Sequence, residues 1–279
     1  MTNEYYYFIS GLPEIHFEQT KTLPNRVELF SEALEQVEAE DRAAIRIIRY
    51  PIDNKNLCAR LEKRDVPFVD GGNFTQDHLD RGLKDPDLLP SYMSDFIQNH
   101  AEQKRDFPQL NVFEDELTWI FFEFTAQSVH PFIRDWFCFD LDIRNILAGL
   151  NCRQYKRPCS SMIVGDNDVA EAVLKSQAAD FGLTPIFPLA EKICELYKDN
   201  PLALELGIDQ IRWNKLEDIP SSSFFRIESL LAYFLKLDMA SRRQGLTPER
   251  GQERIDTLTD ELKKSFQFSE SFQHAGGTL

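Results

Sequence analysis

The sequence has no excess of basic charge and no glycine-rich phosphate loop. Its 279 residues include 46 acidic and 31 basic side chains, which gives a formal charge of −15. Nucleic acids and anionic lipids bind clustered Lys and Arg, so this balance argues against a nucleic-acid partner and against direct adhesion to a membrane. The patterns G-x-x-x-x-G-K-[ST] and G-x-G-x-x-G are both absent, which argues against the common nucleotide-binding loops.

Metal ligands and nucleophiles are also sparse. No two of the five histidines are four residues apart, so the sequence indicates no histidine metal site on a helix. Cys152 and Cys159 make only half of a zinc pattern, and an odd total of five cysteines is typical of free thiols in a reducing compartment. Nothing marks Ser160 or Ser161 as an activated nucleophile. We therefore predict no catalytic residue, no cofactor or metal, and no small-molecule substrate.

A long hydrophobic run is lacking as well. The most apolar stretch, "TWIFFEFTA", contains Glu123 and is far shorter than the ~20 residues that a spanning helix needs. The opening "MTNEYYYFISGLPE" has neither the basic start nor the apolar core of a signal peptide. We therefore expect a soluble, cytoplasmic protein without direct membrane insertion, which reaches a membrane only through another protein.

What the sequence does contain is helical periodicity. Between Pro131 and Arg153, large apolar residues recur in steps of three and four, which predicts one face of a long helix. Asn25 is placed to cap a helix over "NRVELFSEALEQVEAED". Only "YYYFIS" and "RPCSSMIV" are candidate strands, and both are short. The prediction is an all-α protein with long helices.

One pattern, D-x-x-N-[LI]-x-A-x-L-x-x-R, occurs twice without gaps. Its copies are Asp53, Asn56, Leu57, Ala59, Leu61 and Arg64, and Asp142, Asn145, Ile146, Ala148, Leu150 and Arg153. A helix-capping pair would suit Asp53, which closely follows Pro51, but not Asp142 in the middle of the long helix. We favour a packing signature, in which a stripe of polar and small residues lets another helix approach and form hydrogen bonds with its backbone.

This pattern resembles the D-x-x-N-[LI] signature of the C/d family of central-stalk components in the V-type and A-type rotary ATPases, where the eukaryotic members are called d. In that family the signature recurs in three related helical modules. The segment from Phe225 to Ile255 resembles the family's closing segment, with Tyr233, Asp238 and Arg242 at matching positions. This third copy lacks the Asn and has Ser241 beside Arg242 instead. The chain resembles a divergent bacterial version of the family.

The resemblance implies three helical modules arranged as a funnel-like or V-shaped array. We place the modules at residues 1–80, 81–165 and 166–268, followed by a flexible tail at 269–279. It also implies a non-catalytic rotor subunit of the central stalk, which couples the central shaft to the membrane rotor ring during ion transport. Those two parts are the implied partners, and the implied location is peripheral to the inner membrane.

Each of the first two copies ends in basic residues that are unusual in so acidic a chain. They are Arg60, Lys63 and Arg64 in the first copy, and Arg153, Lys156 and Arg157 in the second. One interpretation is a pair of solvated helix ends, where cations suit the helix dipole. The other is a set of partner-binding cations that face an acidic shaft or rotor loop. On that hypothesis, Arg153→Glu with Arg157→Glu weakens binding without unfolding the protein.

Two other functions compete with the rotor subunit. A helical scaffold or adaptor unrelated to an ATPase would make the repeated pattern a coincidence of helix packing. An enzyme with an all-α site would need a pocket of convergent polar groups, for which His130, Asp140 and Asp142 are the obvious candidates.

Overall fold

The computed structural model describes residues 4–18, 22–102, 113–219, 223–244 and 259. Within these residues the chain is helical and contains no strand, so the all-α prediction is confirmed. The elements are α1 (Tyr6–Gly11), α2 (Arg26–Gln36), α3 (Ala39–Ile47), α4 (Tyr50–Leu61), α5 (Gln76–Gly82), the 3₁₀ turn η1 (Pro86–Leu88), α6 (Ser91–Ala101), α7 (Phe113–Ala126), α8 (Pro131–Tyr155), α9 (Asp168–Lys175), α10 (Leu189–Leu196), α11 (Pro201–Glu217) and α12 (Ile227–Gln244).

Local sequence explains where these helices begin. Asn25 caps α2 as expected, since its side chain accepts hydrogen bonds from the backbone of Val27 and Glu28. Pro51 lies in the first turn of α4 and Pro131 begins α8, positions where the missing N–H of proline costs nothing. The candidate strand "YYYFIS" is not a strand, because Tyr6–Gly11 forms the short helix α1.

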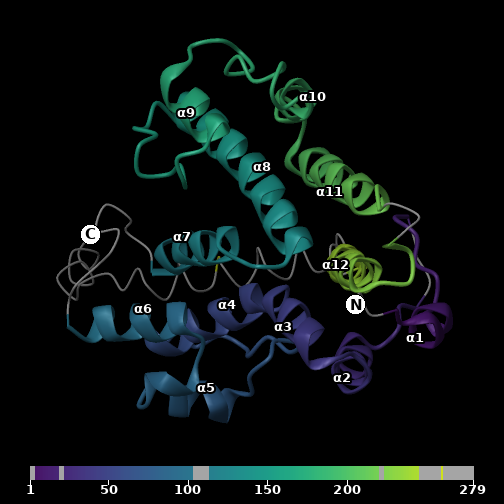
Figure 1. The fold of residues 1–279 in the computed structure, drawn as a ribbon. Coiled ribbons are helices and arrows are strands. Elements are labelled where there is room, and N and C mark those ends of the chain that lie inside the picture. Colours follow the sequence, from purple (N-terminus) through teal and green to yellow (C-terminus); the bar gives the residue numbers. More distant parts are fainter. Residues whose placement is uncertain (1–3, 19–21, 103–112, 220–222, 245–258, 260–279) are drawn as a thin grey trace, which may run out of the picture.

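The long helix α8 joins two separate hydrophobic cores. Near its start, Ile133, Trp136 and Phe137 pack in the larger core with residues from α2–α4, α6, α7 and α12. Beyond its middle, Ile143 and Ile146 pack in a smaller core with α9, α10 and α11. Figure 1 shows α8 crossing from the layer of α7 and α4 to the group of α9, α10 and α11. Because α8 contributes to both cores, it links the two halves through buried side chains.

The last described helix of the larger core also packs against helices near the amino terminus. Helix α12 contacts α2 and α3, and Figure 1 shows it beside this amino-terminal group. The larger core contains residues of all three predicted modules, from Tyr5 to Ala240. The division into three modules and the funnel-like or V-shaped arrangement stay predictions. The predicted tail at 269–279 lies outside the described residues.

Candidate functional site

The first copy of the repeated pattern holds the segment that follows its own helix. Asn56 on α4 is buried, and its side-chain amide pairs with the backbone of Val69 through two hydrogen bonds. Nδ2 of Asn56 donates to the Val69 carbonyl at 2.8 Å, and Oδ1 accepts from the Val69 N–H at 2.9 Å. The Asn56 amide therefore pairs with both the N–H and the carbonyl of Val69. A side-chain amide is suited to this because it has one donor and one acceptor group.

The second copy makes the same contact. Asn145 on α8 is fully buried, its Nδ2 donates to the Val164 carbonyl at 2.8 Å, and its Oδ1 accepts from the Val164 N–H at 3.0 Å. The separation along the chain is 13 residues in the first copy and 19 in the second. Equal contacts across unequal loops show that the pattern specifies a common local structure, in which a non-helical segment returns to the helix.

The aspartates of the pattern bind the same return segments. Asp53 accepts hydrogen bonds from the backbone N–H of Asn73 and Phe74, and from the Asn73 side chain at 2.7 Å. Asp142 accepts from the side chain of Asn167 at 2.8 Å. We call the residues Asp53, Asn56, Val69 and Asn73 the first clamp, and Asp142, Asn145, Val164 and Asn167 the second clamp.

Neither aspartate of the pattern caps a helix, and neither Asn56 nor Asn145 binds another helix. Asn167 of the second clamp does cap α9, since its side chain accepts a hydrogen bond from the Ala170 N–H. Asp53 lies inside α4, whose N-cap is Arg49, so the capping interpretation is wrong for the first copy. Our packing interpretation is wrong about the partner of Asn145, which is a non-helical segment and not another helix. Close approach of a helix does occur at Gly149, where a Cβ would lie 2.5 Å from Cγ1 of Val173 on α9.

The remaining matched positions divide into equivalent and non-equivalent ones. Leu57 and Ile146 are both fully buried. Arg64 lies at the surface beside Glu62 and Glu114, at 3.0 and 3.2 Å. Arg153 instead donates to the carbonyls of Ser176 and Ala178 and stacks 3.6 Å from the Phe181 ring centroid. The final Arg of the pattern therefore has different contacts in its two copies.

The third, incomplete copy connects different elements instead of forming a clamp. Asp238 on α12 receives two hydrogen bonds, at 2.7 and 2.6 Å, from Nη1 of the fully buried Arg49. Arg26 on α2 lies 3.3 Å from the same carboxylate. Arg242 pairs with the fully buried Asp209 of α11. The charged residues of the last helix thus tie α12 to the start of α4 and to α11.

Tyr233 is the remaining residue of the third copy and lies on α12, before Asp238 and Arg242. Its hydroxyl is buried and has no hydrogen-bond partner within the described part of the chain. Burial raises the pKa of this hydroxyl to about 12. The side chain therefore stays neutral and behaves as a packing residue.

The six predicted partner-binding cations do not all have free charges. Arg60 binds Asp80 through two hydrogen bonds of 2.8 Å, and Arg64 and Arg153 have the partners given above. Lys63, Lys156 and Arg157 are exposed and form no ion pair with the residues that the structure describes. Both lysines adopt a left-handed backbone conformation at the end of their helices, with φ of 53° and 50°.

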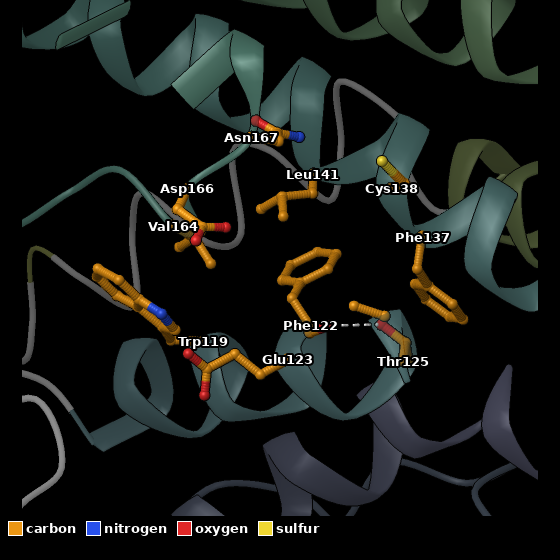
Figure 2. A pocket seen from close by; sticks show the side chains of 12 residues that line it. Trp119, Phe122, Glu123, Thr125, Phe137, Cys138, Leu141, Val164, Asp166 and Asn167 are labelled. Carbon is orange, nitrogen blue, oxygen red and sulfur yellow. Dashed lines mark hydrogen bonds between the residues drawn. The ribbon is translucent and has the colours of Figure 1, made fainter. Parts of the chain in front are cut away.

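The return segment of the second clamp forms part of an apolar pocket of about 450 Å³ (Figure 2). Trp119 and Phe122 of α7 and Leu141 of α8 supply apolar walls, and Val164 also lines the pocket. Cys138 is a further lining residue, and burial raises the pKa of its thiol. A thiol in that state is a weak nucleophile.

The candidate residues for an enzyme do not converge. His130 precedes α8, and Asp142 lies twelve residues later, about 18 Å away along the helix. Asp140 is paired with Arg212 at 2.6 Å, and Asp142 with Asn167. In the described ranges, no three His, Cys, Asp or Glu side chains are grouped so that they could hold a metal ion. No helix in those ranges is long and apolar enough to cross a bilayer.

The fold and the clamps define a helical protein with two helix-and-return units, in each of which a buried Asn binds the backbone of one Val. The model of a family described as "Protein of unknown function (DUF2764)" matches residues 1–266. The chain belongs to that family. It is similar to an uncharacterized protein of Chlamydia pneumoniae, with 24% identity over 275 residues that cover 93% of this chain and 99% of the relative. An uncharacterized protein of Chlamydia muridarum is 21% identical over 276 residues, which cover 94% and 99%.

The first clamp predicts a measurable pH dependence of stability. Burial raises the pKa of Asp53 from 3.8 to about 6, although the N–H donors of Asn73 and Phe74 and the charge of Arg49 oppose the shift. The folded state therefore holds this proton more tightly than the unfolded state does. The stabilisation that the raised pKa of Asp53 provides is therefore complete below about pH 4 and is lost as the pH rises to about 6. Between these values the free energy of unfolding falls by roughly 1.4 kcal/mol per pH unit.

The measurement is the free energy of unfolding between about pH 4 and pH 6 for the wild type and for Asp53→Asn. Other acids contribute to both curves, so the difference between the two proteins isolates Asp53. We expect the difference to change by about 2–3 kcal/mol across this range. Parallel curves would contradict the raised pKa.

Proposed function

We propose that this chain is a non-catalytic rotor subunit of the central stalk of a V/A-type rotary ATPase. It would couple the central shaft to the membrane rotor ring and act on the cytoplasmic side of the inner membrane as part of that complex. The observation that supports this most strongly is the repeated D-x-x-N pattern, whose two copies make equivalent clamps at Val69 and Val164. Repeated modules with this pattern are what the resemblance to the C/d family implies.

The structure also offers the mechanical properties that the proposal needs. A part that transmits torque must resist bending between its two binding faces. Here α8 runs through both cores, and hydrogen bonds to two buried Asn side chains hold the return segments against α4 and α8. Close-packed interiors have low compressibility and transmit strain, so such a body can carry force between two partners.

The contacts of Arg153 change the proposed test of the basic clusters. Its guanidinium holds the carbonyls of Ser176 and Ala178, so Arg153→Glu would disturb the fold as well as any partner. Lys63, Lys156 and Arg157 are the members of the two clusters whose charges can be changed without breaking such a contact. Their role in binding the shaft or the rotor ring is part of the proposal.

The coupling role is tested with inverted membrane vesicles from cells depleted of this chain. We expect ATP hydrolysis by the soluble head to continue while the ATP-driven membrane potential, followed with a potential-sensitive dye, is lost. Expression of the wild-type chain should restore the potential. An undiminished potential in depleted vesicles would contradict the coupling role and would favour the alternative, a helical scaffold or adaptor unrelated to the ATPase.

A further inference from the structure

A groove of about 520 Å³ runs along the surface of α8. One side of the groove is a face of this helix, which includes Asp140, Arg144, Leu147 and Tyr155. From Asp140 to Tyr155 the helix extends about 22 Å, a length of four turns. A groove of this length matches a partner helix of about 15 residues, which would lie alongside α8.

The groove combines apolar anchoring surface with positive charge. Tyr155 and Met162 line it and are 62% and 48% exposed, large values for apolar side chains. Arg144 and Arg157 also line it, and Lys156 is exposed next to Arg157. Exposed apolar side chains with basic neighbours are typical of a surface that binds an amphipathic acidic segment.

The charge balance shows which sign the groove prefers. Arg212 is neutralised by Asp140 at 2.6 Å and lies 3.7 Å from Asp209. Arg144 has a longer and half-exposed contact with Asp115, at 3.5 Å. Arg157 has no ion pair within the described residues and lies 6.0 Å from the ring centroid of Tyr155. The groove therefore keeps a positive excess in a chain whose formal charge is −15.

Other hollows on the same protein have the opposite balance. The pocket of Figure 2 is lined by Glu123 and Asp166 and by no Lys or Arg among its described residues. The smaller hollow beside Pro131 is lined by three carboxylates and one lysine. The positive charge of the groove is thus specific to α8 and its neighbours and is not shared by these other hollows.

We propose that the groove along α8 binds an acidic amphipathic helix of a partner protein. The apolar face of that helix would pack against Leu147, Tyr155 and Met162, and its carboxylates would pair with Arg144 and Arg157. This inference rests on the proposed function only for the identity of the partner, which is a helix of the central shaft. The acidic and amphipathic chemistry comes from the groove itself.

The test places a photo-reactive benzoylphenylalanine at position 162 of the full-length chain, expressed in its source organism. After illumination, the chain is purified from gently solubilised membranes and the crosslinked peptide is identified by mass spectrometry. We expect a peptide of the central shaft with excess Asp and Glu and with apolar residues every three to four positions. The control places the same photo-reactive residue at position 186, where Ile186 is 55% exposed and lies outside the groove.

A pair of charge variants gives an independent measurement. Arg157→Glu with Met162→Glu changes the groove, and Lys55→Glu with Ile186→Glu makes the same change in net charge elsewhere. All four positions are exposed. We expect the groove variant to recover at least roughly tenfold less of the shaft protein than wild type, since reversing charges across an interface costs several kcal/mol. The control variant should recover as much as wild type, and both should unfold at the wild-type temperature.

The outcomes separate this inference from the proposed function. If the wild type recovers the ATPase and the groove variant does so equally well, the groove inference is wrong and the rotor proposal stands. A crosslink from position 162 to a basic peptide, or no crosslink there, would also overturn the inference. If position 162 crosslinks to an acidic helix of an unrelated protein, the groove chemistry is supported and the rotor proposal is contradicted.

Discussion

Replacement of Asp238 by Ala is expected to lower the free energy of unfolding by about 3–5 kcal/mol, the usual cost of leaving a buried charge without its partner. Asp238 is the counter-ion of Arg49, whose side chain is fully buried. Nε and Nη2 of Arg49 have no hydrogen-bond partner among the described residues, and its guanidinium lies 4.6 Å from the Phe30 ring centroid. The arginine therefore depends on this carboxylate.

Urea denaturation followed by tryptophan fluorescence measures this loss. The matched control is Asp80→Ala, which removes the counter-ion of the exposed Arg60 and should cost no more than about 1 kcal/mol. Replacing both partners, as Arg49→Met with Asp238→Leu, should recover most of the loss, because no fully buried charge is left uncompensated. Equal losses for Asp238→Ala and Asp80→Ala would contradict the buried pair as a tie between α12 and the start of α4.

Asn145→Ala is expected to cost about 2–4 kcal/mol, because it leaves two buried backbone groups of Val164 without partners. Val164 is itself buried, so water has limited access to its amide and carbonyl. Asn56→Ala removes the equivalent contacts of Val69, which is only partly buried, and should have a smaller loss because water can reach the freed groups. Asn151→Ala is the control, since Asn151 is exposed and accepts one hydrogen bond from Tyr197.

Amide hydrogen exchange locates the effect of each substitution. In Asn145→Ala the Val164 amide should lose protection while the Val69 amide keeps it, and Asn56→Ala should give the reverse. That crossed result is expected because each Asn binds the return segment of its own helix. Loss of protection at both valines in either variant would show that the two clamps are not independent units.

The sequence predicted the helical class and the repeated pattern, because both depend on spacing along the chain. Steps of three and four placed α8 within a few residues, from Pro131 to Tyr155. The same reasoning failed for "YYYFIS", since three consecutive aromatic residues favour a strand locally and only packing decides. In α1, Phe8 is buried in the larger core, and Tyr6 packs against the ring of Phe225.

The sequence did not predict what the clamps bind, although a signal was present. The return segments read "VDGGN" from Val69 and "VGDN" from Val164. Each contains a glycine with positive φ, Gly71 in the first and Gly165 in the second. A Val followed by glycine and Asn after each copy of the pattern would have indicated a second, matching half of the repeat. The unequal spacing of 13 and 19 residues concealed it.

The tie between Asp238 and Arg49 could not be predicted from the sequence. The two residues are 189 positions apart, and nothing in the local pattern around Arg49 marks it as buried. Arginine is rarely buried without a partner, so burial followed only from the packing of α12 against the amino-terminal helices. The structure was likewise needed to separate the exposed Lys63, Lys156 and Arg157 from the other basic residues of the two clusters. Those others, Arg60, Arg64 and Arg153, have partners within the fold.

The most direct test of the rotor proposal is an affinity purification of the tagged full-length chain from gently solubilised membranes of its source. Mass spectrometry should recover the head, shaft and rotor-ring proteins of a V/A-type ATPase together with this chain, in constant proportion. Recovery of none of these proteins, with the intact ATPase in the unbound fraction, would contradict the proposal and leave the helical adaptor as the better account.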